Sequence, residues 1–136
     1  MEDRAQTGAP PARSAATVLV IEDELGMLEI LSVNLQASGF RVVTASDGVD
    51  GWQAFEREQP DLVLLDLNLP RVSGFRLLEL FKGPAGDPGV PVVALTALDF
   101  VEAEELVRLG LDGFIKKPFE PKELVETLRH VLAQRR

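Results

Sequence analysis

The sequence predicts an α/β fold in which a parallel sheet of five strands lies between two layers of helices. Short runs rich in β-branched residues recur along the chain, and a segment with helical spacing follows each run. The runs are apolar at consecutive positions, which is typical of strands that are buried on both faces. Regular alternation of strand and helix favours parallel pairing, because each helix returns the chain to the start of the next strand.

The predicted elements alternate without interruption from strand one to helix five. The strands are expected at Val18–Ile21, Arg41–Thr44, Leu62–Leu65, Val92–Leu95 and Phe114–Ile115. The helices are expected at Glu24–Ala37, Asp47–Glu58, Ser73–Lys82, Phe100–Leu109 and Glu120–Gln134. Asp47 is a candidate N-cap. Gly51 lies inside its helix, where glycine costs about 1 kcal/mol relative to alanine.

Composition restricts the classes of function. The 136 residues suit one domain, and residues 1–16 are polar, rich in Ala and Pro, and predicted to be a disordered extension. The chain has no cysteine and one histidine, which excludes thiol chemistry and His clusters for metals. A net charge of −8 disfavours direct nucleic-acid binding. No apolar run is long enough to span a membrane, and a cytoplasmic location is expected.

Polar residues follow four of the predicted strands at their carboxyl ends. Glu22 and Asp23 follow the first strand, Asp66 the third, Thr96 the fourth and Lys117 the fifth. Parallel strands bring these ends to one rim of the sheet, where open α/β folds bind ligands. Each residue alone has a simpler explanation as a turn, cap or surface residue. Their occurrence at four strand ends together favours a functional site.

This set of residues is suited to phosphoryl chemistry. Three carboxylates at one rim need a cation, and Mg²⁺ prefers carboxylate oxygens, water and phosphate. An aspartate beside Mg²⁺ can act as a nucleophile and form an aspartyl phosphate. Lys117 can supply a positive charge, and Thr96 a hydrogen bond, to the phosphoryl oxygens. Asp66 is therefore the predicted phosphoryl acceptor.

The chain resembles the receiver domain of bacterial two-component response regulators from about residue 16 to residue 134. The segments that carry the resemblance are VLVIEDE, PDLVLLDLNLP followed by SG, VVALTA, and DGFIKKPF. The resemblance implies a doubly wound (βα)5 fold of the flavodoxin-like type, with strand order 2-1-3-4-5. It also implies that residues 17–136 form a receiver domain, which catalyses only its own phosphorylation and dephosphorylation and is otherwise not an enzyme.

The resemblance also implies a role for each residue of the rim. Asp66 would be the phosphoryl acceptor, and Lys117 would bind the phosphate. Thr96 and Phe114 would move together as the switch. The implied Mg²⁺ ligands are Asp23, Asp66, the backbone carbonyl of Asn68, and Glu22 through water. The Lys117–Pro118 bond is cis in the family.

Partners follow from the same resemblance. The phosphoryl donor would be a phosphohistidine on a sensor histidine kinase or a histidine phosphotransfer protein. Phosphorylation would reshape the face formed by the fourth helix, fifth strand and fifth helix, which would control an effector protein or an output domain. Phe100, Val101, Arg108 and Phe114 are expected on or near that face. The protein would be a monomer or a phosphorylation-dependent dimer.

The sequence departs from the family pattern at several positions. The interval from Thr96 to Lys117 is one residue shorter than usual, with the deletion predicted within the segment ALDF. Leu98 is expected to border the site. Gly113 and Thr127 replace the charged residues that form salt bridges in the activated dimer of the winged-helix branch, which disfavours that dimer.

Three alternatives stay open. A phosphorylation-independent receiver-like adaptor usually lacks one of the rim residues, and none is lacking here. A phosphatase of the haloacid-dehalogenase type places its acceptor after the first strand. A nucleotide-binding or flavin-binding protein would have a glycine-rich loop after the first strand, where this chain reads IEDELG.

Overall fold

The computed structural model describes residues 15–69, 72–97 and 100–134, with the backbone alone for residues 100–103. Five parallel strands form one sheet in the order β2-β1-β3-β4-β5, so the predicted α/β fold and the strand order are confirmed. The strands are β1 (Thr17–Ile21), β2 (Arg41–Ala45), β3 (Leu62–Asp66), β4 (Val92–Thr96) and β5 (Gly113–Lys116). The predicted extension at residues 1–16 lies almost wholly outside the described residues.

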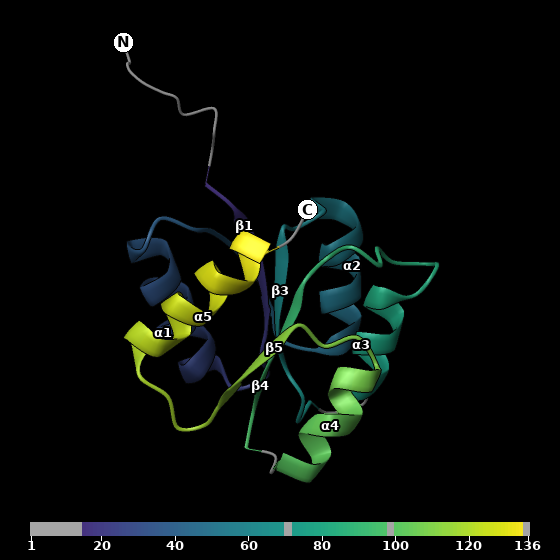
Figure 1. Ribbon diagram of the computed structural model, residues 1–136. Coiled ribbons are helices and arrows are strands. Elements are labelled where there is room, and N and C mark those ends of the chain that lie inside the picture. The colour runs from purple at the N-terminus through teal and green to yellow at the C-terminus, as the bar shows by residue number, and fades with distance from the viewer. Residues whose placement is uncertain (1–14, 70–71, 98–99, 135–136) are drawn as a thin grey trace.

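Helices cover both faces of the sheet (Figure 1). Helices α1 (Leu25–Ala37) and α5 (Pro121–Gln134) lie on one face, and α2 (Gly48–Glu58), α3 (Gly74–Lys82) and α4 (Phe100–Arg108) lie on the other. Each observed helix end lies within one residue of the predicted end. No helix among the described residues is long and apolar enough to cross a bilayer.

Alternating strand residues build two separate cores. Leu19, Val63 and Ala94 belong to the core beneath α2, α3 and α4, whereas Val20 and Leu64 belong to the core beneath α1 and α5. Adjacent residues of a strand point to opposite faces, so a continuous apolar run supplies both cores. This arrangement explains why β3 and β4 contain no polar residue before their last position.

An aromatic stack joins α2 to α3 within the first core. The Trp52 ring lies 5.6 Å from the Phe55 ring and 5.9 Å from the Phe81 ring, and the Phe55 and Phe81 rings are 4.7 Å apart. Phe81 is fully buried, while Trp52 is partly exposed. The three rings fix the two helices against each other on this face of the sheet.

The helix ends follow local chemistry. The Asp47 side chain accepts a hydrogen bond from the Asp50 N–H at 2.8 Å and caps α2, as predicted. The Ser73 hydroxyl does the same for α3 with the Arg76 N–H. Gly39 and Gly110 follow α1 and α4 with φ of 97° and 103°, a conformation that favours glycine. The N-caps set where α2 and α3 begin, and the two glycines set where the chain leaves α1 and α4.

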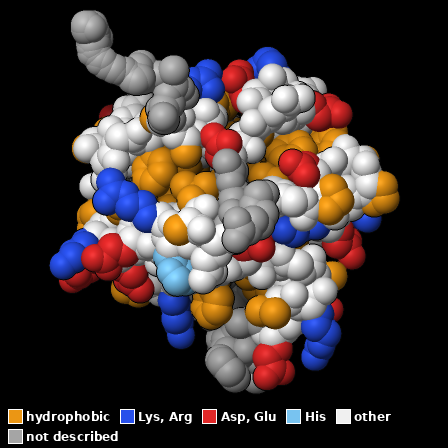
Figure 2. Space-filling view, turned by 45° about the horizontal axis from the view of Figure 1, so that its top comes forward, with side chains coloured by type: hydrophobic (Ala, Val, Ile, Leu, Met, Phe, Trp, Pro, Cys, Tyr) orange, Lys and Arg blue, Asp and Glu red, His pale blue; other side chains and the backbone are white. Residues whose placement is uncertain are grey.

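The face of the molecule at the start of the strands carries side chains of both signs of charge (Figure 2). Figure 2 turns the amino-terminal ends of the strands toward the viewer and shows acidic, basic and apolar side chains interspersed. The opposite edge of the sheet, where the strands end, carries the predicted functional residues.

Candidate functional site

The rim at the carboxyl ends of the strands brings the predicted residues together. Glu22 follows β1, Asp66 ends β3, Thr96 ends β4 and Lys117 follows β5. In the sheet register, Asp66 lies opposite Leu95 and Thr96 opposite Lys116, so these strands end nearly level. Glu22, Asp66 and Thr96 are only 1%, 3% and 4% exposed, and they are the buried polar residues of the described chain. The rim is therefore a polar site within an apolar core.

Lys117 lies between the two buried carboxylates. Its Nζ is 3.5 Å from Asp66 Oδ2 and 3.6 Å from Glu22 Oε1. The Lys117 backbone N–H donates to the Thr96 carbonyl at 2.8 Å, which fixes the start of the loop after β5 against the end of β4. The bond from Lys117 to Pro118 is cis, as the resemblance implies. One ammonium group thus faces two carboxylates.

The Asp66 carboxylate is oriented through its two oxygens. Oδ1 accepts a hydrogen bond of 2.9 Å from the Asn68 N–H, and Oδ2 faces Lys117. The hydrogen bond to Asn68 holds the chain just beyond β3 close to the carboxylate. The Asn68 side chain is exposed. Asn68 therefore lies beside the carboxylate, and the role of its backbone carbonyl as a ligand stays a prediction.

Glu22 is more deeply buried than its exposed neighbour Asp23. Burial raises the pKa of the Glu22 carboxyl to about 7, and the adjacent Asp66 carboxylate adds to the rise. The Glu24 N–H donates to Glu22 Oε2 at 3.2 Å, and this bond and the charge of Lys117 act in the opposite direction. Glu22 Oε1 is buried without a hydrogen-bond partner among the described residues. An oxygen of this kind is suited to a ligand or to water.

The donor set fits a small, hard cation. Glu22, Asp23 and Asp66 each direct one carboxylate oxygen to a common region, and these oxygens lie within 4.8 Å of one another. Oxygen donors alone, with net negative charge, suit Mg²⁺ better than a softer metal. Glu22 Oε1 has an ion pair with Lys117 at 3.6 Å but no hydrogen bond among the described residues, which leaves it able to face a second positive group.

The predicted switch residues lie on β4 and β5. Phe114 pairs with Ala94 in the sheet register, and its side chain is 38% exposed. Arg108 is exposed and forms an ion pair with Glu105. The side chains of Phe100 and Val101, as well as Leu98, lie outside the described residues.

Two glycines near the rim make close contacts that the sequence did not predict. A Cβ at Gly74 would lie 2.4 Å from the Leu67 Cα, just beyond Asp66. A Cβ at Gly51 would lie 2.7 Å from the Ile21 Cδ1, just before Glu22. The pair Ser73–Gly74 was visible as a motif, but its contact partner was not. Gly51 appeared only as a weak helix residue, whereas the structure places β1 directly beneath it.

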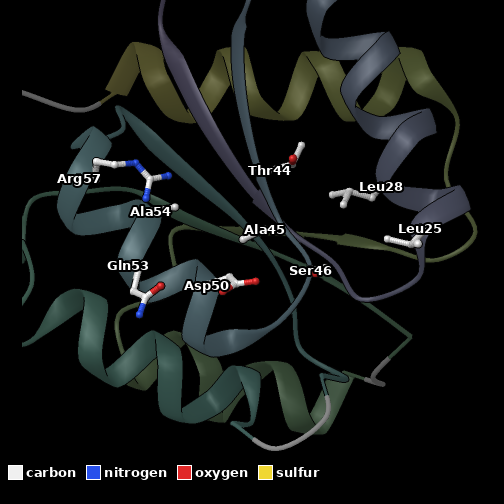
Figure 3. A pocket seen from close by; sticks show the side chains of 9 residues that line it. All are labelled: Leu25, Leu28, Thr44, Ala45, Ser46, Asp50, Gln53, Ala54 and Arg57. Carbon is white, nitrogen blue, oxygen red and sulfur yellow. The ribbon is translucent and has the colours of Figure 1, made fainter.

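The hollow beside the edge strand β2 is a separate feature. It measures about 330 Å³, and its lining comes from α1, β2 and α2 (Figure 3). Leu25 and Leu28 face it from α1, while Gln53 and Arg57 extend from α2. None of the buried polar residues of the rim contributes to it. The hollow is therefore a feature separate from the rim.

Curated relatives resemble the chain over most of its length. The probable transcriptional regulator ycf27 of Guillardia theta is 39% identical over 116 residues, which cover 85% of this chain and 44% of that protein. The DNA-binding response regulator MtrA of Mycobacterium tuberculosis is 39% identical over 113 residues, which cover 82% of this chain and 48% of that protein. The chain thus spans about half the length of the curated relatives it matches.

Solved structures share the fold. The chemotaxis response regulator CheY4 of Vibrio cholerae has a TM-score of 0.82 at 28% identity, covering 87% of this chain and 99% of that one. NtrX from Brucella abortus has a TM-score of 0.81 at 31% identity, covering 88% of this chain and 27% of that one. The family model described as "Response regulator receiver domain" matches residues 18–129. With its fold and acidic rim, the chain belongs to the family of response regulator receiver domains.

Proposed function

We propose that Asp66 accepts a phosphoryl group and that residues 17–136 act as a phosphorylation-controlled receiver of a two-component system. One observation carries the proposal. The Asp66 carboxylate is buried at the rim, is oriented by the Asn68 N–H, and faces the Lys117 ammonium at 3.5 Å. A buried carboxylate with this orientation is positioned for attack on an incoming electrophile.

The reaction is a transfer of the phosphoryl group from a phosphohistidine. An Asp66 carboxylate oxygen attacks the phosphorus and forms a P–O bond, while the P–N bond breaks and its electron pair returns to the imidazole. The charge spreads over the three phosphoryl oxygens. Lys117 neutralises part of it, and the Thr96 hydroxyl donates a hydrogen bond to it. Water attack on the same phosphorus breaks the P–O bond to Asp66, which releases inorganic phosphate and restores the carboxylate.

The acidic residues would hold Mg²⁺ through the Asp23 and Asp66 carboxylates, the Asn68 carbonyl, and Glu22 through water. Bound Mg²⁺ supplies charge neutralisation for the phosphoryl oxygens and for the carboxylates. Among the described residues, Lys117 is the positive group that faces Glu22 and Asp66. Glu22, whose Oε1 has no hydrogen-bond partner among the described residues, would orient water or a ligand at the base of this site.

The phosphoryl group would change the surface by a shift between two states. It gives the Thr96 hydroxyl a new acceptor, and Phe114, which is partly exposed here, turns inward into the space that Thr96 leaves. The face of α4, β5 and α5 then presents a different shape to an effector or output domain. Several relatives are named as transcriptional or DNA-binding regulators and extend well beyond the matched region. An attached DNA-binding output domain is consistent with that extra length.

Covalent labelling tests the proposal. The protein is incubated with Mg²⁺ and acetyl phosphate, and its intact mass is measured over time. We expect the addition of one phosphoryl group in wild type and none in Asp66→Asn. The variant Asp50→Asn, which changes an exposed aspartate on α2, is the matched control and should react as wild type does.

The outcomes separate the alternatives. Absence of covalent phosphate on the wild type at every Mg²⁺ concentration contradicts the proposal and favours the phosphorylation-independent adaptor. Repeated turnover of unrelated phosphoesters favours a phosphatase. Modification that persists in Asp66→Asn assigns the acceptor to another residue.

A further inference from the structure

We infer that Gly74 is a positioning residue for the phosphoryl acceptor, an inference that rests on the function proposed for Asp66. The lack of a side chain at Gly74 lets the first turn of α3 lie directly on the backbone that follows Asp66. The contact would set the orientation of the reactive carboxylate and not only the stability of the fold.

The contact at Gly74 is with backbone atoms. A Cβ at this position would lie 2.4 Å from the Leu67 Cα, 2.8 Å from the Leu67 Cδ2 and 3.0 Å from the Asp66 carbonyl oxygen. Gly74 is helical and has no positive φ, so glycine is required here by space and not by conformation. Any larger residue must displace either the start of α3 or the chain from Asp66 to Leu67.

That segment of chain is the one that orients the carboxylate. The Asn68 N–H, two residues beyond Asp66, donates to Asp66 Oδ1 at 2.9 Å. A displacement of Leu67 therefore moves the donor relative to the acceptor carboxylate. Rotation of the carboxylate also changes the distance from Oδ2 to Lys117, which is 3.5 Å here.

Both packing and hydrogen bonds hold the segment from Leu67 to Leu69. The Gly74 N–H to Leu67 carbonyl distance and the Leu67 N–H to Leu95 carbonyl distance are both 3.4 Å, at the long end for such bonds. Leu67 and Leu69 are 6% and 9% exposed and anchor the segment in the core. The close fit at Gly74 therefore adds to the restraint on the backbone between these anchors, where the two main-chain hydrogen bonds are long.

A matched control exists at the other end of the same helix. A Cβ at Gly86, in the loop that follows α3, would lie 2.4 Å from the Phe81 carbonyl oxygen and 2.5 Å from the Leu80 carbonyl oxygen. The steric conflict with backbone is thus as severe as at Gly74. Gly86 lies in the α3–β4 connection, which leads to the opposite end of the sheet from Asp66. Comparison of alanine substitutions at Gly74 and Gly86 therefore separates a loss of stability from a change in the orientation of the Asp66 carboxylate.

The experiment compares Gly74→Ala and Gly86→Ala in the full chain. The rate constant of modification is measured at saturating Mg²⁺ and acetyl phosphate by intact mass, and the Asn68 amide is followed by ¹H–¹⁵N NMR without Mg²⁺. A misplacement of about 1 Å at a reacting group costs on the order of 100-fold in rate. We expect a loss of that size in Gly74→Ala, together with faster hydrogen exchange at the Asn68 amide. Gly86→Ala should lose stability and retain both the rate and the Asn68 signal.

Equal rates in the two variants, with an unchanged Asn68 amide, would overturn the inference. The NMR arm does not depend on phosphorylation: an unreactive wild type contradicts the function proposed for Asp66, while the Asn68 amide still reports on Gly74. If Gly74→Ala does not fold, Ser73→Ala replaces it. Loss of the Ser73 hydrogen bond to the Arg76 N–H should loosen the first turn of α3, and with it Gly74, over Leu67 without adding atoms. A wild-type rate and a wild-type Asn68 amide in that variant would also contradict a positioning role.

Discussion

Burial of the Glu22 carboxyl lowers the stability of the fold, although the same carboxyl is suited to a role at the proposed cation site. Its carboxyl is buried next to Asp66, and one of its oxygens has no hydrogen-bond partner among the described residues. Desolvation of the Glu22 carboxylate opposes folding more than its ion pair with Lys117 favours it, whereas a bound cation would favour the ionised form. The metal-free protein is therefore less stable with Glu22 ionised than with Glu22 protonated.

The pH dependence of Glu22→Gln tests this conflict. The pKa of Glu22 rises from 4.5 to about 7 on folding, so its contribution to stability is present below pH 4.5 and is lost as the pH rises through 7. Glutamine cannot ionise, so the variant should become more stable than wild type above pH 7, by up to about 3 kcal/mol. Urea unfolding followed by circular dichroism, with EDTA present, measures the difference on both sides of this window.

Glu56→Gln provides the control for Glu22→Gln, because it makes the same change at an exposed position of α2. Glu56→Gln should change the free energy of unfolding by the same amount below pH 4.5 and above pH 7. A gain for Glu22→Gln that does not grow with pH would contradict the assigned cause.

Sequence reasoning identified the residues of the rim but not their environments. Glu22, Asp66 and Lys117 were predicted from their places after the strands, and the structure brings them together. The sequence did not distinguish the buried Glu22 from the exposed Asp23, because that difference depends on how the chain turns out of the sheet. Gly74 was missed because its partner, Leu67, is defined only by the packing of α3 on the chain after β3.

At the scale of helices and strands, local chemistry predicted most ends and long-range packing decided the rest. The cap at Asp47 was visible in the sequence because its side chain acts on a backbone N–H three residues away. Strand β5 is longer than predicted, Gly113–Lys116, because its exposed edge residues do not resemble a buried strand. Gly51 is explained by Ile21 beneath it, a contact between elements that no local pattern reveals.

The N-cap residues of α1 and α2 should respond differently to substitution by alanine. Asp47→Ala removes the bond to the Asp50 N–H and should lower the free energy of unfolding by about 1 kcal/mol. Glu24, the N-cap of α1, makes no side-chain cap bond, so Glu24→Ala should cause no comparable loss. Chemical denaturation of both variants, monitored by circular dichroism, compares them. Equal losses would show that the cap bond of Asp47 contributes nothing specific.

At the scale of the whole molecule, alternation of strand and helix sufficed to predict the α/β class. Strand order did not follow from the alternation, because several orders satisfy the same pattern, and it came from the family resemblance. The order matters for function, since it places β3 between β1 and β4 and so surrounds Asp66 with the ends of its neighbours. With a net charge of −8, the chain also favours cations in general.

Specific Mg²⁺ binding should stabilise the folded chain by mass action. At about 100 times the dissociation constant, the gain is about 2.7 kcal/mol. Differential scanning calorimetry should show a rise in Tm with Mg²⁺ at constant ionic strength, because the unfolded chain lacks the assembled carboxylates. Asp23→Asn should abolish most of the rise. An equal rise in the variant would assign the effect to general screening of the negative charge.

The aromatic stack of α2 and α3 gives the protein a built-in optical probe. Trp52 is the sole tryptophan of the chain, so indole emission arises from one place, beside Phe55 and Phe81. Loss of the contact between α2 and α3 should alter the intensity and wavelength of that emission, without any attached dye. Because α3 begins at Gly74, close to the acceptor, and contacts Trp52 through Phe81 near its end, stopped-flow fluorescence can test whether events at the rim reach the far end of the same helix.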